Sequence, residues 1–371
     1  MLILCLAGLT YCTIALVAIL RFGARATKLR DASPGMTVLK PVAGLEAELF
    51  ENLCSFCDQD AQTFQVIFGV ARQDDAAVEV IRRVIERFPQ RDLALVIGDR
   101  PFAGNPKVAN LRSMFALAKY DLLVVADADM RVDRTYLRAL AADFADDRVG
   151  AVTCLYAGIA LGGLASQLAA LQLNDQFAPS VLVATLRGDP RFCLGSTMAV
   201  RRDALEAIGG FEALARYLAD DYMLGAFVHA HGYRVVLSRY VVRNVVAEPG
   251  MRALLHHELR WARTIRSVQT LGYACSFVTF PLPFALAWVL ISPGTVAAWI
   301  AMCVTLAVRL GMHAAMRRAF ALSGAPASWL LLPLRDCIGL GIWAAGLFGN
   351  SVRWKHRRLG VADLLRDGGD R

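Results

Sequence analysis

Long apolar runs lie at both ends of the chain, and alternating strand and helix patterns fill the middle. Leu2 to Leu20 is nearly continuous in apolar residues and is about long enough to cross a bilayer. No positive side chain precedes this run, whereas basic residues follow it at Arg21, Arg25, Lys28 and Arg30. This order predicts an uncleaved anchor over residues 1–30, with the following chain in the cytoplasm.

The middle of the chain, residues 31–250, predicts one α/β catalytic domain. Strand patterns alternate with amphipathic helical patterns, which indicates a mostly parallel sheet with helices on both faces. We expect Pro41 to end the first strand, and a Gly-x-Gly-x-x-Gly dinucleotide fingerprint is absent after it. Strands are predicted at 37–40, 64–70, 93–97, 122–125 and 149–153, and helices at 46–56, 76–88, 107–118, 164–177, 202–208 and 218–231.

The C-terminal part predicts membrane-associated segments. Residues 251–270 form an interfacial helix in this interpretation, and two transmembrane helices follow within 271–312, joined by a Pro-Gly turn. The last apolar run, 329–349, contains Arg335 and Asp336 and has basic residues on both sides. We therefore expect residues 313–371 to form a re-entrant or interfacial hairpin and a basic cytosolic tail, with both charges near the headgroups.

Composition supports a membrane protein. The 371 residues are 56% hydrophobic, and the mean hydropathy is +0.45, which is too apolar for an ordinary soluble enzyme. The net charge of +8 is concentrated beside the apolar runs, so it indicates membrane flanks and no nucleic-acid partner. The nine cysteines have no disulfide or metal spacing, and the lone Cys54-x-x-Cys57 is interpreted as buried, reduced thiols.

Two acids directly follow the most apolar predicted strand. Leu122 to Val125 leads through one alanine to Asp127 and Asp129, which places both acids at the carboxyl end of a buried strand. Two carboxylates this close favour a positive charge between them, and a divalent cation that carries a diphosphate would supply it. A turn acid beside a helix N-cap is the alternative.

Two further acid pairs lie at expected strand or helix ends. Asp74 and Asp75 follow the second strand and could accept hydrogen bonds from a base or ribose, or one of them could cap the next helix. Asp220 and Asp221 begin a helix, where capping explains one acid and a general base for a hydroxyl explains the other. Lys107 is either a positive contact in the site or a solvated helix residue.

The predicted interfacial helix carries a stripe of arginines. Arg260, Arg263 and Arg266 follow at spacings of three residues, and Trp261 follows the first of them. For Arg263 and Arg266 we favour contacts with anionic headgroups. For Arg260 and Trp261 we favour a functional role, because they match the motif of a known protein family.

Together these motifs resemble the family-2-type glycosyltransferases, and within them the ceramide glucosyltransferase group. That group has three separated acidic sites followed by a (Gln/Arg)-x-x-Arg-Trp box, and here His257 stands where the group has Gln or Arg. The residues that match this group are Asp75, Asp127, Asp221, and the box from His257 to Arg260 and Trp261. Within the group, the run from His257 to Arg266 and the segment from Gly272 to Leu286 resemble bacterial glycosyltransferases associated with hopanoid biosynthesis.

The resemblance implies a GT-A fold and an inverting transfer of a hexose from a UDP-sugar to a lipid hydroxyl, on ceramide or a hopanoid polyol. It further implies Mg²⁺ or Mn²⁺ on Asp129 with Asp127, a general base at Asp221, and a location in a bacterial-type inner membrane with the catalytic domain in the cytoplasm. Substrate contacts would come from Asp74, Asp75, Lys107, Asp127, Asp220 and His257, with Arg260 and Trp261 over the site. The alternatives are a processive polysaccharide synthase or a non-catalytic membrane binding protein.

Overall fold

A computed structural model describes residues 1–31, 34–98, 104–322, 326–349, 351–354 and 357–360. The chain divides into two compact units. The sheet unit comprises residues 26–156 and 188–245, and the helical unit comprises residues 1–25, 157–187 and 246–371. Residues 157–187 therefore interrupt the predicted catalytic segment and belong to the helical unit.

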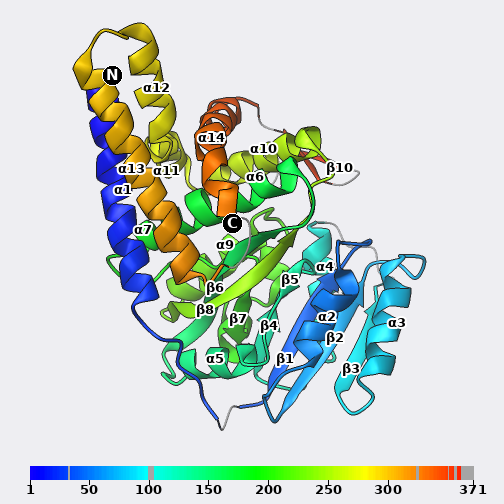
Figure 1. The fold of residues 1–371 in the computed structure, drawn as a ribbon. Helices are drawn as coiled ribbons and strands as arrows, with labels where there is room; N and C mark the ends of the chain where they lie inside the picture. The colour runs from blue at the N-terminus through cyan, green and yellow to red at the C-terminus, as the bar shows by residue number, and fades with distance from the viewer. Residues whose placement is uncertain (32–33, 99–103, 323–325, 350, 355–356, 361–371) are drawn as a thin grey trace, which may run out of the picture. The chain divides into compact units, whose positions relative to one another are not determined.

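The sheet unit is organised around an eight-stranded mixed sheet in the described residues, with the strand order β3-β2-β1-β4-β7-β6-β8-β5 (Figure 1). The first four strands in this order are parallel, whereas β7 pairs antiparallel with both β4 and β6. The strands are β1 (Met36–Val42), β2 (Phe64–Val70), β3 (Asp92–Ile97), β4 (Leu122–Val125), β5 (Met130–Arg131), β6 (Val149–Ala160), β7 (Met198–Arg201) and β8 (Arg234–Val246).

Helices cover both faces of this sheet, as the alternating pattern predicts. Side chains of a strand point alternately to opposite faces, so Val124 packs into one core and Leu123 into the other. One core contains residues of α2 (Leu49–Cys57), α3 (Ala77–Arg87) and α5 (Tyr136–Asp143). The other contains residues of α4 (Pro106–Phe115), α8 (Arg202–Ala207) and α9 (Asp220–Ala230).

The first strand runs further than the sequence predicts. Pro41 lies inside β1, opposite Gly69 of β2, and the strand continues to Val42. Proline has no backbone N–H, so it removes one hydrogen-bond donor from a strand. In β1 the parallel pairing tolerates this loss, because Pro41 lies one residue before the strand end. The prediction that Pro41 ends the strand is therefore wrong.

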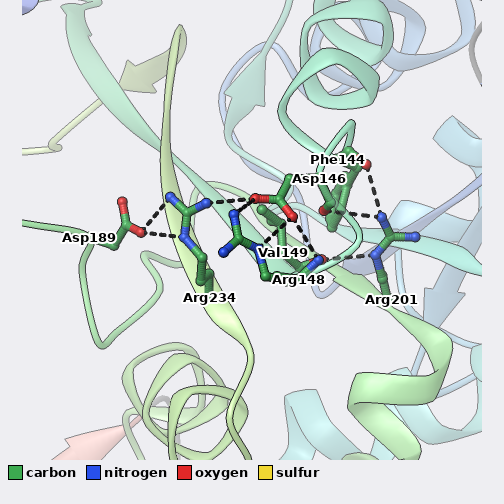
Figure 2. Close-up of polar contacts among 7 residues, drawn as sticks. All are labelled: Phe144, Asp146, Arg148, Val149, Asp189, Arg201 and Arg234. Carbon is green, nitrogen blue, oxygen red and sulfur yellow. Dashed lines mark hydrogen bonds and ion pairs between the residues drawn. The ribbon is translucent and has the colours of Figure 1, made fainter.

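One edge of the sheet carries a network of paired charges (Figure 2). Arg234 lies between Asp146 and Asp189, with 2.8 Å from a guanidinium nitrogen to a carboxylate oxygen in each pair. Arg201 donates to two backbone carbonyls, each at 2.9 Å. Since Arg201 pairs with Leu122, the first residue of β4, this network marks the amino end of that strand. Its charges are satisfied by one another, which is typical of a structural network.

In the described part of the helical unit, two helices are long and apolar enough to cross a membrane, α1 (Leu2–Gly23) and α13 (Val296–Ala319). A bent pair could form a further span among the described residues, with α11 and a 3₁₀ turn (Thr270–Thr279) meeting α12 (Pro281–Ile291) at 54°. The unit's other elements are α6 (Leu164–Gln172), a π-helical turn (Leu173–Phe177), α7 (Ala178–Ala184), α10 (Met251–Val268), α11 (Thr270–Cys275), α14 (Leu332–Gly346), β9 (Ser351–Trp354) and β10 (Arg357–Gly360).

The charges in the last apolar run are buried inside protein. Arg335 and Asp336 are the fourth and fifth residues of α14, where both residues are fully buried. Arg335 donates to Glu258 at 2.6 Å, and Asp336 accepts from Arg309 at 2.7 Å. Each charge therefore has a protein partner and needs no lipid headgroup to compensate it, and the predicted position of the segment near the headgroups stays a prediction.

Candidate active site

The predicted acids of the sheet unit gather at the edge opposite the paired-charge network. Strands β1, β2 and β4 are parallel, so their carboxyl ends lie at one edge, and Asp127 follows β4 there. The segment before β7 reaches the same edge. A Cβ placed on Gly195 would lie 3.0 Å from Asp127 Oδ2 and 3.3 Å from Asp221 Oδ2. Asp127, Asp221 and Gly195 are therefore close neighbours.

Lys107 lies between two of the four acids Asp127, Asp129, Asp220 and Asp221. Its Nζ is 2.7 Å from Asp127 Oδ1 and 3.6 Å from Asp220 Oδ2, and its side chain is only 15% exposed. Burial alone would lower the pKa of Lys107, but Asp127, Asp220 and Asp221 outweigh burial and raise it. The ammonium is therefore a permanent charge, and the alternative of a solvated helix residue does not apply. Asn105 also donates to Asp220, at 3.2 Å.

Asp129 is the other acid of the β4 motif, and it forms no ion pair within the described residues. Asn244 of β8 donates to its Oδ2 at 2.7 Å. Burial, followed by repulsion from Asp127, raises the pKa of Asp129 to about 6. A positive charge added beside this carboxylate would relieve that repulsion, so Asp129 and Asp127 fit the predicted cation site. No group of three or more His, Cys, Asp and Glu side chains that could hold a metal occurs among the described residues.

Asp221 is also without an ion pair in the described part of the chain. Its Oδ1 accepts a hydrogen bond from the backbone N–H of Tyr222 at 2.8 Å, at the start of α9. Burial raises the pKa of Asp221 to about 6, and repulsion from Asp220 adds to the shift. The residue is partly exposed, so a hydroxyl can approach a carboxylate that is ionised at neutral pH but more basic than usual.

Lys40 is a site residue that the sequence analysis did not single out. It is fully buried in β1, its Nζ donates to the backbone carbonyl of Asp127, and it lies 3.7 Å from the centre of the Phe56 ring. Burial lowers the pKa of Lys40 to about 7, although Asp127 and Asp129 act in the opposite direction. A lysine inside an apolar strand is unusual, and this is the signal that could have identified it.

Asp74 and Asp75, which follow β2, have other partners than the acids described above. Asp75 accepts from the backbone N–H of Ala77 at 2.9 Å and from that of Gly44 at 3.0 Å, so it supports the start of α3 and joins the loops that follow β1 and β2. Asp74 forms an exposed ion pair with Arg72, which holds the pKa of Asp74 below its usual value. Capping is therefore observed for Asp75, and its predicted contact with uridine stays a prediction.

The predicted box lies on α10, in the helical unit. His257 Nδ1 is 2.8 Å from Glu248 Oε1, and the rings of His257 and Trp261 are 4.4 Å apart in an edge-to-face arrangement. Arg260 lies one residue before Trp261 and is partly buried. The acids thus gather in one unit, and the box residues gather in the other.

Arg266, another arginine of the stripe, contacts the protein at the end of α14. Arg266 donates to the carbonyls of Leu347 and Gly349 just beyond the end of α14, at 2.6 Å for Gly349. Cations favour the carboxyl ends of helices, where backbone carbonyls lack partners. Arg266 therefore caps α14, and its predicted headgroup contact stays a prediction.

Comparison with known proteins decides the family. The family model described as "Glycosyl transferase family 21" matches residues 1–365, which is nearly the whole chain. The chain belongs to glycosyl transferase family 21. The resemblance to ceramide glucosyltransferases that the motifs indicate is confirmed by this match.

Curated relatives of this family 21 chain include lipid glycosyltransferases. Ceramide glucosyltransferase 1 of Caenorhabditis elegans is 25% identical over 233 residues, which are 62% of this chain and 49% of that protein. Beta-monoglucosyldiacylglycerol synthase of Synechocystis is 26% identical over 234 residues, which are 61% of this chain and 46% of that protein. The chain therefore spans about half the length of the curated relatives it matches.

A solved structure shares the fold. The mannosyltransferase PcManGT of Pyrobaculum calidifontis, solved in complex with GDP-Man and Mn²⁺, superposes with a TM-score of 0.54 at 19% identity. The superposition covers 93% of this chain and 96% of that one. The predicted α/β GT-A fold with membrane helices at both ends of the chain is confirmed.

Proposed function

We propose that this family 21 chain is an inverting membrane glycosyltransferase that moves a hexose from a UDP-sugar to a lipid hydroxyl. The proposal is based on a difference in ion pairing among the four acids at one edge of the sheet. Lys107 lies at ion-pair distance from Asp127 and Asp220, whereas Asp129 and Asp221 form no ion pair within the described residues and have pKa values of about 6. Two carboxylates in different environments can take two different roles.

Asp221 is the general base in this proposal. The acceptor hydroxyl donates its proton to the Asp221 carboxylate while its oxygen attacks the anomeric carbon from the face opposite the nucleotide, so the configuration inverts. A base with a pKa of about 6 is ionised at neutral pH and holds the proton better than an ordinary aspartate. The hydrogen bond from Tyr222 N–H fixes one carboxylate oxygen and directs the other.

Asp129 and Asp127 would hold a divalent cation, Mg²⁺ or Mn²⁺, together with the donor diphosphate. Carboxylate oxygens are the ligands that these ions prefer, and donor phosphates complete such sites. When bound, the cation would supply positive charge for the leaving diphosphate. Asn244 and Lys40 keep the Asp127–Asp129 loop in place, and Asp75 would accept hydrogen bonds from the uridine.

His257, Arg260 and Trp261 would act on the acceptor side. They lie on an amphipathic helix in the unit that contains the candidate membrane spans, so a lipid could present its hydroxyl without leaving the bilayer. The proposed orientation keeps the sheet unit in the cytoplasm of a bacterial-type inner membrane, because the basic flanks follow the apolar runs.

Mass spectrometry of lipid products tests the function. Membranes that contain the protein receive UDP-glucose or UDP-N-acetylglucosamine with ceramide, a bacteriohopane polyol and diacylglycerol as competing acceptors. We expect one lipid to gain one hexose, and its identity assigns the acceptor and the donor. Diacylglycerol is included because a relative is named as a glucosyldiacylglycerol synthase. If no lipid gains a sugar although the donor is bound, lipid transfer is not the function.

Gly195→Ala should lower turnover about tenfold or more without unfolding the protein. The added Cβ would lie 3.0 Å from Asp127 and 3.3 Å from Asp221, so both carboxylates must shift, and a change of about 1.4 kcal/mol in a barrier alters a rate tenfold. Gly188→Ala is the matched control, because nothing lies within 4 Å of a Cβ placed there. Equal turnover of both variants would contradict the close approach of Gly195 to the reacting groups.

A further inference from the structure

Two adjacent residues near the start of α14 carry opposite buried charges, and each charge has a different partner. Arg335 donates to both carboxylate oxygens of Glu258 in α10, at 2.6 and 2.7 Å, and to the carbonyl of Leu168 in α6 at 3.4 Å. Its neighbour Asp336 accepts from two guanidinium nitrogens of Arg309 in α13, at 2.7 and 3.1 Å. Arg335 and Asp336 are 0% exposed, and Glu258 is 6% exposed.

Stability alone is a weak reason for such a pair. Removing two charges from water costs several kcal/mol per ion, so an apolar pair of similar volume often stabilises a fold equally well. Apolar side chains, however, do not fix the orientation of the partner helix. A guanidinium that meets both oxygens of one carboxylate fixes distance and orientation together. The Arg335–Glu258 pair can therefore set the position of α10.

Glu258 lies within the box itself. The buried positions of α10 are Leu254, Glu258 and Ala262, which recur every four residues and form one inward face. Trp261, three residues after Glu258, borders this face, whereas Arg260 lies on the far side of the helix, and both are partly exposed. Because side chains on one helix turn together, a rotation of α10 at Glu258 would move Arg260 and Trp261 by the same angle.

A second attachment holds the residue next to Glu258. His257 meets Glu248 at 2.8 Å, and the backbone N–H of Glu248 donates to Ser166 Oγ at 2.9 Å. The His257 ring in turn packs against the Trp261 ring. Adjacent residues of α10 are thus held by two different parts of the helical unit, and this arrangement fixes the helix about its own axis.

We propose that Glu258 and Arg335 are positioning residues, whose buried two-point ion pair sets the rotation of α10 and thereby presents Arg260 and Trp261 to the lipid acceptor. This inference rests on the proposed function. Neither side chain needs to touch a substrate, since the pair acts through the helix that carries the box.

The test replaces both charges at once. Glu258→Met with Arg335→Met removes the pair without leaving an unpaired buried charge. Arg309→Met with Asp336→Leu is the matched control, because it removes the neighbouring buried pair of α14, which has no partner in α10 among the contacts described here. The measurements are melting temperature, UDP-sugar binding, hydrolysis of the donor by water, and kcat and KM for the lipid.

We expect the Glu258/Arg335 double variant to transfer sugar to lipid about 100-fold more slowly, since a displacement of about 1 Å can cost that much. Donor binding and donor hydrolysis should stay within about twofold of wild type, and the Arg309/Asp336 control should keep lipid transfer. Arg335→Lys, which keeps the charge but loses the two-point contact, should lower transfer about tenfold in a folded protein.

Four outcomes would overturn the inference. Equal lipid transfer by the Glu258/Arg335 double variant and wild type would show that the pair only supports the fold. Equal losses in both double variants, or wild-type transfer by folded Arg335→Lys, would remove the special role of the two-point contact with α10. Absence of lipid transfer by the wild type would overturn the proposed function as well, so the two failures are distinguishable.

Discussion

Asp221→Asn should lose most turnover while it keeps the donor. The amide has nearly the shape of the carboxylate, and it still accepts the hydrogen bond from Tyr222 N–H, but it cannot take a proton from the acceptor. A general base contributes a factor of roughly 10² to 10⁴, which is the expected fall in kcat. Steady-state kinetics with the lipid acceptor and direct UDP-sugar binding measure the two effects separately.

A matched control and a pH profile test the Asp221 assignment. Asp203→Asn changes another acid in the first turn of a helix, but one that is exposed, and it should keep kcat. Since the base must be ionised, wild-type kcat should fall as the pH drops below about 6, the pKa of Asp221. Near-normal turnover of Asp221→Asn would exclude it as the base.

Asp129→Asn should abolish most of the stimulation by a divalent cation and weaken donor binding by about 100-fold. An amide offers a neutral oxygen in place of a charged one, and the charge on a metal contributes several kcal/mol at a developing anion. Titration of UDP-sugar binding with and without Mg²⁺ or Mn²⁺ measures the loss. Asp221→Asn should retain the cation effect, so the two variants should fail in different assays.

Asp133→Asn is the control for the Asp129 variant. Asp133 is an exposed acid four residues further on, and its Oδ1 accepts from the N–H of Thr135 at 2.8 Å, which an asparagine can replace. Its donor binding should match wild type. Cation-dependent binding that survives in Asp129→Asn would mean that the cation, if used, is held elsewhere.

The sequence predicted those parts of the site that depend on local order along the chain. Leu122 to Val125 is a buried strand, so the acids that follow it had to lie at its carboxyl end. Lys40 and Asn244 could not be linked to Asp127 and Asp129 in this way. Their strands are adjacent to the acids only after the sheet has formed, and no local pattern encodes that pairing.

The helical part of the fold was predicted less well for a related reason. An apolar run with Arg335 and Asp336 indicates that charge must be compensated, but the partners Glu258 and Arg309 lie 77 and 27 residues away. From the sequence alone, lipid headgroups were the expected partners of these two charges. The π-helical turn at Leu173–Phe177 was likewise hidden within a continuous helical pattern, although it directs the buried Asp175 toward His313 at 3.0 Å.

The interrupted chain path limits how the protein can be dissected. The sheet unit resumes at residue 188 only after the excursion through residues 157–187, so a fragment from 26 to 245 would carry this excursion without its neighbours. Leu168 and Leu182 are buried in the full chain, in helices that contact α14 and α1 respectively. Such a fragment would expose apolar surface and aggregate. A soluble fragment of the sheet unit requires replacement of 157–187 by a short polar connection, and simple truncation at both ends is insufficient.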